Sequence, residues 1–249
     1  MEVKKAENRI HFLDELRGIC IICMVFFHAF FDIAFFYEWK LGIRLFEFFS
    51  PAVPWFAGLF IFISGVCCHL SRSNIKRGAQ LLLIAMGMTI ITSFMDDLFI
   101  AFGILHLLSI GMLLYGLLEK FIKKIPLWLG LTVCAAVFVL TYSISYGYYI
   151  GFPGLFTVHM PVWLTENPVM FIFGIINDNF VSGDYFPLLP WLFLFIAGTL
   201  VGRYVRKLPE ILSKKRFKPL CFVGRHTLLI YVLHQPVILL FVWLFTLIV

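Results

Sequence analysis

Apolar residues occur along the chain in long runs, and short polar segments separate one run from the next. Seven runs have close to the roughly 20 mostly apolar residues that an α-helix needs to cross a bilayer. They cover residues 16–37, 54–70, 79–95, 100–118, 126–146, 186–204 and 226–249. The pattern predicts an all-α fold, a polytopic membrane helix bundle of about seven transmembrane helices.

The segments between these runs are mostly short. Residues 38–53 are expected to form a loop, and the longest segment outside a predicted helix covers residues 147–185. Within it, residues 167–177 read "NPVMFIFGIIN", which is apolar but too short to span a bilayer, so a short outer or re-entrant helix is expected there. Because the chain shows neither an internal repeat nor a linker, we expect one domain over residues 1–249.

Composition supports a membrane protein, since 61% of the residues are hydrophobic and only 14% are charged. Of the 20 Lys and Arg residues, 17 fall in segments that lie on one side if the N-terminus is cytoplasmic. These segments are 4–9, 72–77, 120–124 and 203–225. The bias predicts a cytoplasmic N-terminus and an extracytoplasmic C-terminus in the cell membrane, and it explains the net charge of +6 better than a nucleic-acid partner does.

The six cysteines match no disulfide or zinc-binding spacing. Cys20 and Cys23 lie inside an apolar run, and Cys67 and Cys68 are adjacent. We interpret them as small core residues and expect no metal site.

Ionisable residues interrupt the first apolar run on one side. At about 100° per residue, with Arg17 at zero, His28 falls near 20° and both Asp14 and Asp32 fall near 60°. At about 1.5 Å per residue, His28 lies roughly 16 Å from Arg17, near the middle of the membrane. Because ionisable groups are costly there, the stripe is expected to face a site; mutual pairing of His28 and Asp32 is the structural alternative.

Further polar residues are expected at the ends or the middle of other helices. His106, His234 and Gln235 lie at depths comparable to that of His28, and Pro236 is expected to kink the last helix beside them. A structural role for each histidine as a hydrogen-bonded core residue is the alternative. His69 and Arg72 fall at the cytoplasmic rim, where a phosphate group or water is the expected partner.

Five stretches resemble one family of membrane proteins. They read "RIHFLDELRGICIICMVFFH", "FIFISGVCCHLSR", "FGILHLLSIG", "FPLLPWLFLFIAGTLVGR" and "GRHTLLIYVLHQPV". The chain resembles bacterial members of the heparan-alpha-glucosaminide N-acetyltransferase catalytic-domain-like family, within the wider transmembrane acyltransferases that modify cell-surface sugars. Those enzymes carry a basic residue and a histidine separated by ten residues on the first helix, which Arg17 and His28 match here.

The resemblance implies an acetyltransferase that takes acetyl-CoA from the cytoplasm and transfers the acetyl group to an amino or hydroxyl group of a sugar or glycan. Arg17, His69 and Arg72 are the candidates for donor binding. His28, oriented by Asp32, is the candidate base. The candidates for acceptor binding are Asp14, His106, His234 and Gln235.

The chain departs from the lysosomal enzyme of this family, which has an asparagine where His28 stands and takes its catalytic histidine from the following loop. Residues 38–53 contain no histidine, and the chain is also shorter than that enzyme, so heparan itself is a poor candidate for the acceptor. The acceptor, a homodimer and an acyl-enzyme intermediate are all left open. The rival readings are a proton-coupled transporter or receptor for a small polar solute and a haem-binding electron carrier.

The charge bias generates the first testable prediction. A cysteine added after Val249, in a variant whose native cysteines are replaced by alanine, should react with a membrane-impermeant maleimide in intact cells. Labelling only from the cytoplasmic side would contradict the predicted orientation.

Overall fold

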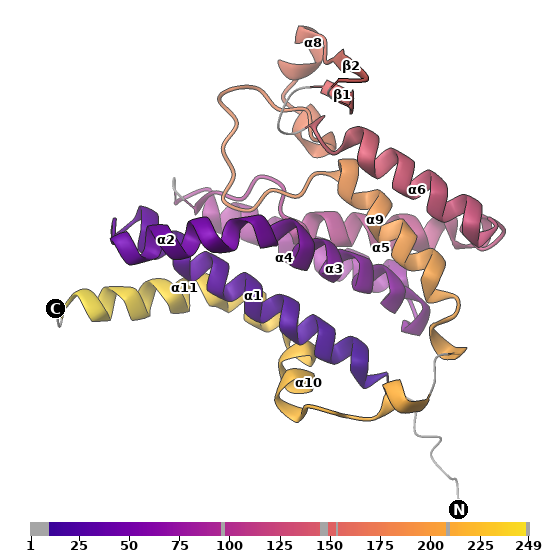
Figure 1. Ribbon diagram of the computed structural model, residues 1–249, viewed down its shortest axis with the longest axis horizontal. Helices are drawn as coiled ribbons and strands as arrows, with labels where there is room; N and C mark the ends of the chain where they lie inside the picture. The colour runs from indigo at the N-terminus through magenta and orange to yellow at the C-terminus, as the bar shows by residue number, and fades with distance from the viewer. Residues whose placement is uncertain (1–9, 96–97, 145–148, 153, 208–209, 248–249) are drawn as a thin grey trace, which may run out of the picture. The chain divides into compact units, whose positions relative to one another are not determined.

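Each of the seven apolar runs contains an α-helix in the computed structural model, which describes residues 10–95, 98–144, 149–152, 154–207 and 210–247 (Figure 1). The helices are α1 (His11–Phe35), α3 (Val53–Val66), α4 (Asn74–Thr92), α5 (Ile104–Ile122), α6 (Leu127–Thr141), α9 (Leu188–Gly202) and α11 (Thr227–Thr246). Five helical stretches of the described residues are long and apolar enough to cross a membrane, whereas α6 and α9 have 15 residues each. The predicted all-α membrane fold is confirmed.

Five further elements among the described residues were not expected from the apolar pattern. Helix α2 (Lys40–Phe49) occupies most of the expected 38–53 loop, and the 3-10 helix η1 (Ser50–Ala52) joins it to α3. Helix α10 (Lys218–Arg225) precedes α11, and strands β1 (Tyr149–Phe152) and β2 (Phe156–His159) form an antiparallel hairpin. The expected loop is wrong because Lys40, Arg44 and Glu47 recur at a helical spacing and leave an apolar face between them.

The apolar stretch at residues 167–177 contains the 3-10 helix η4 (Met170–Phe173), and one helical turn, α8 (Val162–Thr165), precedes it. Helix η4 ends at Gly174, whose φ of 95° lies in the left-handed region that favours glycine. The expected short outer helix is therefore reduced to single turns.

The chain packs as two compact units. The first unit comprises Met1–Phe60 and Lys207–Val249, and the second comprises Ile61–Arg206. In the first unit, α1 packs against α2, α10 and α11 (Figure 1). In the second unit, α4 packs against α5, and α9 packs against both α5 and α6. One domain over residues 1–249 stays a prediction.

Glycines set the closest helix contacts in each unit. A Cβ at Gly18 of α1 would lie 2.4 Å from the Leu220 carbonyl oxygen, and one at Gly224 of α10 would lie 1.7 Å from the Asp14 carbonyl oxygen. In the second unit, Gly65 and Gly198 bring α3 and α9 together in the same way. Small residues allow such close approach, which is typical of helix packing in membranes.

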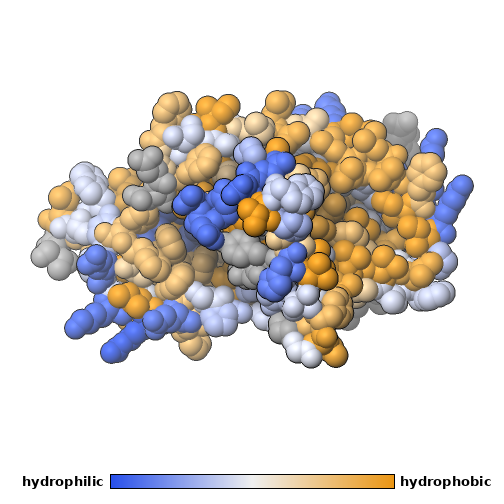
Figure 2. Space-filling view, turned by 90° about the horizontal axis from the view of Figure 1, so that it is seen from above, coloured by the Kyte–Doolittle hydropathy of each residue, from blue (hydrophilic) through white to orange (hydrophobic). Residues whose placement is uncertain are grey.

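Large hydrophobic side chains cover much of the surface, and Figure 2 shows wide areas of hydrophobic colour. Phe48 and Trp55 are each 81% exposed and Phe94 is 85% exposed, which is far from the usual burial of aromatic residues in soluble proteins. Such a surface is stable against lipid. The protein is a multi-pass membrane protein.

The contact between α1 and α10 generates a stability prediction. Gly224→Ala should lower the free energy of unfolding by about 1 to 3 kcal/mol, because the added methyl group forces two backbones apart. Thermal unfolding in detergent measures the change. Gly87→Ala on α4 is the matched control, since none of the described atoms lies within 4 Å of a Cβ there, and it should leave the melting temperature unchanged or higher. Equal melting temperatures for the two variants would contradict the prediction.

Candidate active site and basic pocket

The polar stripe of α1 faces α10 and α11 along its length. Asp14 is near the start of α1, Arg17 follows one turn later, and His28 and Asp32 lie toward the other end. Each has a partner within a short stretch of the last two helices. In the same order, these partners are Arg225, Thr227, His234 and Gln235.

The first turns of α1 hold the start of α10 in place. Glu15 is 7% exposed and its Oε1 accepts hydrogen bonds from the backbone amides of Arg216 (2.8 Å) and Phe217 (2.9 Å). Burial raises the pKa of the Cys221 thiol, which donates to the same oxygen at 3.5 Å. Glu15 therefore has a structural role, which sequence reasoning missed because its partners are backbone groups some 200 residues away.

Arg17 retains unused hydrogen-bonding capacity. Its Nη2 donates to Thr227 Oγ1 at 2.8 Å, and its guanidinium lies 6.0 Å from the centre of the Phe60 ring. Its Nε is buried and has no hydrogen-bond partner among the described residues. A guanidinium held in this way can still bind an anionic group through its remaining N–H groups.

Further along α1, two imidazole rings lie together. The ring centres of His28 and His234 are 4.9 Å apart, and the rings are inclined at 54°. Nδ1 of His234 donates to the Tyr231 carbonyl oxygen, and Nε2 is buried with no hydrogen-bond partner in the described part of the chain. The structure thus joins His28 with His234, a pairing that sequence spacing alone did not show.

Asp32 is fully buried and bonds to Gln235. The Nε2 of Gln235 donates to both carboxylate oxygens, at 2.9 Å each. Between Asp32 and His28 the described structure forms no hydrogen bond. Asp32 and His28, which were expected to interact within α1, therefore each contact a residue of α11.

His106, in the second unit, uses both ring nitrogens locally. Nδ1 accepts from the Gly103 amide at 3.2 Å, which leaves the hydrogen on Nε2, 3.3 Å from Thr89 Oγ1. The side chain is 4% exposed, and the Asp184 carboxylate accepts from the Ile104 amide at 2.9 Å. Together these groups cap the start of α5, so His106 is a hydrogen-bonded residue of the core.

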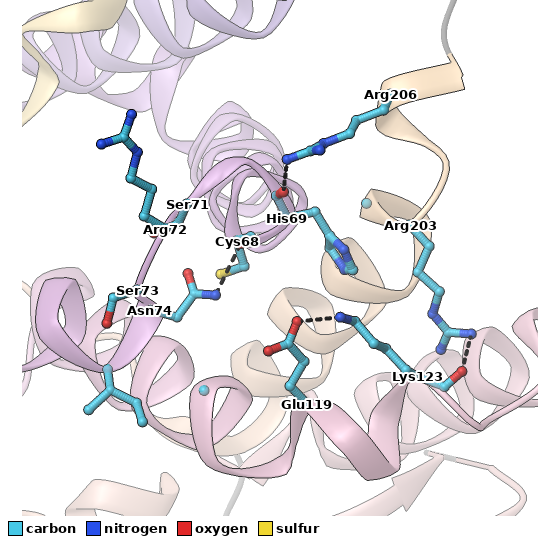
Figure 3. Close-up of a pocket in the computed structure, with 13 residues that line it drawn as sticks. Cys68, His69, Ser71, Arg72, Ser73, Asn74, Glu119, Lys123, Arg203 and Arg206 are labelled. Carbon is cyan, nitrogen blue, oxygen red and sulfur yellow. Dashed lines mark hydrogen bonds and ion pairs between the residues drawn. The ribbon is translucent and has the colours of Figure 1, made fainter. Parts of the chain in front are cut away.

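A basic pocket of about 490 Å³ lies within the second unit (Figure 3). It forms where the end of α3, the start of α4, the end of α5 and the end of α9 meet. Four cationic side chains and one carboxylate line it, together with His69. These charged residues are Arg72, Lys123, Arg203, Arg206 and Glu119.

Several polar groups in this pocket have no hydrogen-bond partner in the part of the chain that the structure describes. Ser71 Oγ, Asn74 Oδ1 and Arg203 Nε are buried and unbonded among the described residues. Asn74 itself is only 8% exposed, and its Nδ2 donates to the Cys68 carbonyl oxygen at 3.0 Å. Because buried polar groups normally find partners, these three are free for a polar ligand.

Other contacts fix the pocket walls. Arg203 donates to the carbonyl oxygens of Ile122 (2.7 Å) and Ile125 (2.8 Å), so it closes the end of α5. Nε2 of His69 lies 2.8 Å from the Thr199 carbonyl oxygen and 2.9 Å from Tyr115 Oη. His69 and Arg72, the predicted donor-binding residues, line this pocket. Lys123, Arg203 and Arg206 were not predicted as binding residues, because their charges follow two separate helices and were interpreted only as a sign of membrane orientation.

The fold and these two sites define a class: a multi-pass membrane protein with ionisable side chains held inside its helices and a cationic pocket at helix ends. A family model described as "Heparan-alpha-glucosaminide N-acetyltransferase, catalytic" matches residues 9–236. The chain belongs to this family of membrane acetyltransferases. Comparison with curated proteins gives no match, and neither does comparison with solved structures.

The bond between Asp32 and Gln235 generates a prediction on coupling. In a double-mutant cycle of Asp32→Ala and Gln235→Ala, the interaction energy should be about 1 to 2 kcal/mol, since each variant alone leaves a buried polar group unpaired. Unfolding in mixed detergent micelles measures it. The cycle of Asp32→Ala with Thr246→Ala is the control and should be additive, because Thr246 bonds only to the Trp243 carbonyl oxygen among the described residues. Additivity in the first cycle would contradict the pairing.

Proposed function

We propose that the protein transfers an acetyl group from acetyl-CoA to an amino or hydroxyl group of a sugar or cell-surface glycan. Membership of the acetyltransferase family supports the reaction type. The observation that carries the proposal is the histidine pair of α1 and α11, because acyl transfer needs a proton acceptor and neutral imidazole is suited to that role.

The donor's chemistry fits the basic pocket. Coenzyme A carries a diphosphate and a 3′-phosphate, and the pocket offers four cationic side chains together with the unbonded donors of Ser71 and Arg203. Charge-assisted hydrogen bonds from arginine to phosphate are among the strongest in proteins. Arg17 of the first unit, whose Nε has no partner in the described chain, is proposed separately as a donor-binding residue.

In the proposed reaction, His28 takes the proton from the acceptor's amino or hydroxyl group as that group attacks the acetyl carbonyl carbon. A new C–N or C–O bond forms, the thioester C–S bond breaks, and the proton passes to the departing thiolate, so that free coenzyme A leaves. Asp32 is proposed to assist His28 indirectly: its hydrogen bond with Gln235 holds α11 in position beside α1. His234 and Gln235 lie beside His28 and are proposed to contact the acceptor.

The proposed orientation places the donor in the cytoplasm. Arg72, Lys123, Arg203 and Arg206 come from three of the cationic segments that the charge bias assigned to the cytoplasmic side, and all four line one pocket. Because these four cations line one pocket, they support a donor that enters from the cytoplasm. The acceptor is proposed to arrive from the opposite side.

The pocket generates a prediction on donor binding. Arg72→Ala and Arg206→Ala should each weaken acetyl-CoA binding by about tenfold, the equivalent of one lost charge-assisted hydrogen bond. Isothermal titration with acetyl-CoA and with its 3′-dephospho analogue measures the change. Lys120→Ala is the control, because it removes an exposed cation of α5 that does not line the pocket. If all three variants bind acetyl-CoA as wild type does, the donor does not use this pocket.

The histidine pair generates a prediction on turnover. His28→Ala should lower acetyl transfer by about 10² to 10⁴ while acetyl-CoA still binds, because a general base acts mainly on the chemical step. Transfer of labelled acetyl groups to an amino-sugar acceptor in reconstituted vesicles measures it. His159→Ala, on the exposed strand β2, is the control and should keep wild-type turnover. Near-normal turnover of His28→Ala would show that the base lies elsewhere.

A further inference from the structure

The ring of His234 is fixed in one tautomer. A backbone carbonyl can only accept, so the hydrogen bond between His234 and the Tyr231 oxygen requires a hydrogen on Nδ1. The neutral ring then carries its lone pair on Nε2. A histidine held through Nδ1 in this way presents its other nitrogen in a defined direction.

That lone pair is unbonded within the described ranges of the chain. Nε2 is buried and lacks a hydrogen bond in the described chain, although buried polar atoms are rarely left unbonded. The ring of His234 contacts the imidazole of His28 and the ring of Tyr231. Asp32 and Gln235 cannot serve as the donor, because Gln235 directs its amide hydrogens at the Asp32 carboxylate.

We infer that Nε2 of His234 is the acceptor for a ring N–H of His28, so that His234, in place of Asp32, is the residue that positions the base. The inference rests on the proposed function and assigns a partner to its central residue. The ring centres are 4.9 Å apart. Two imidazole rings joined by an N–H···N hydrogen bond have their centres about 5 Å apart, so this separation suits such a bond. Catalytic hydrogen bonds are often poorly aligned before substrate binds and tighten in the reacting complex.

This arrangement gives each nitrogen one task. One ring nitrogen of His28 donates its hydrogen to His234, which leaves the lone pair of the other nitrogen for the acceptor's proton. When that proton arrives, His28 becomes a cation and its hydrogen bond to Nε2 becomes charge-assisted. The proton later leaves from the nitrogen that received it, to the coenzyme A thiolate, and His234 keeps its own hydrogen on Nδ1 throughout.

The last helix is built to hold this geometry. Thr227 and Gln235 tie α11 to α1 on either side of His234, through Arg17 and Asp32. Pro236 lies inside α11 and has no amide hydrogen, so the helix lacks one backbone hydrogen bond directly after His234 and Gln235. His234 is therefore a positioning residue that acts through His28.

The test compares two substitutions at one position. His234→Gln keeps an acceptor oxygen near the place of Nε2, whereas His234→Leu removes the acceptor at similar volume. We expect His234→Leu to lower kcat by about 10- to 100-fold, as the loss of an orienting partner typically does, with KM for acetyl-CoA unchanged. His234→Gln should recover most of kcat.

A second readout does not depend on turnover. The ring ¹⁵N chemical shifts of His28, assigned by comparison with His28→Gln in nanodiscs, should show one tautomer with a hydrogen-bonded N–H in the wild type and in His234→Gln, and a mixture of tautomers in His234→Leu. If His234→Leu keeps wild-type kcat and an unchanged His28 spectrum, the inference is overturned. It is also overturned if glutamine behaves as leucine does in both readouts.

The two proposals can fail separately. If wild-type protein transfers no acetyl group from acetyl-CoA to any amino or hydroxyl sugar, the proposed function fails, while the ¹⁵N spectra still decide the role of His234. If transfer occurs and depends on His28 but not on His234, only the inference fails.

Discussion

The backbone contact between α1 and α10 at Gly18 and Gly224 is the constraint on which the polar interior of the first unit depends. Because no side chain separates the two backbones, Glu15 reaches the amides at the start of α10. The same contact brings the end of α10 beside Asp14, and α11 then begins in register with the stripe of α1. The contacts of Arg17, His28 and Asp32 with α11 depend on this alignment of the helices.

Buried polar groups in this protein fall into two kinds. Some have all their main partners within the protein: Glu15 holds backbone amides, Asp32 holds Gln235, and His106 caps α5. Others keep a buried donor or acceptor unbonded in the described chain, namely Arg17, His234, Ser71, Asn74, Arg203 and Gln235. In a low-dielectric interior the first kind stabilises the fold, whereas the second kind is costly until a ligand or a moving proton completes it. The unbonded groups are therefore the better guide to chemistry.

The sequence predicted what depends on local periodicity. The apolar runs became the seven helices, and the angles of Arg17, His28 and Asp32 were enough to place them on one face of α1. It did not predict what depends on contacts across the chain: Asp32 bonds Gln235, 203 residues away, and Arg203 closes the end of α5. Helix α2 was not predicted for a different reason, because a ten-residue amphipathic helix contains no long apolar run.

Helices α2 and α3 form one continuous stretch, Lys40–Leu70, of 31 residues. At about 1.5 Å per residue it is roughly 45 Å long, whereas the hydrocarbon layer of a bilayer is about 30 Å thick. The excess length falls on α2, and its charged residues Lys40, Arg44 and Glu47 favour a place for this end of the stretch at the headgroups. Phe46 of α2 packs on Phe27 and Phe31 of α1, with ring centres 5.5 and 5.8 Å apart, and the Phe27 ring in turn touches His28. The depth at which α2 lies in the bilayer is thereby connected, through the rings of Phe46 and Phe27, to the surroundings of the histidine pair.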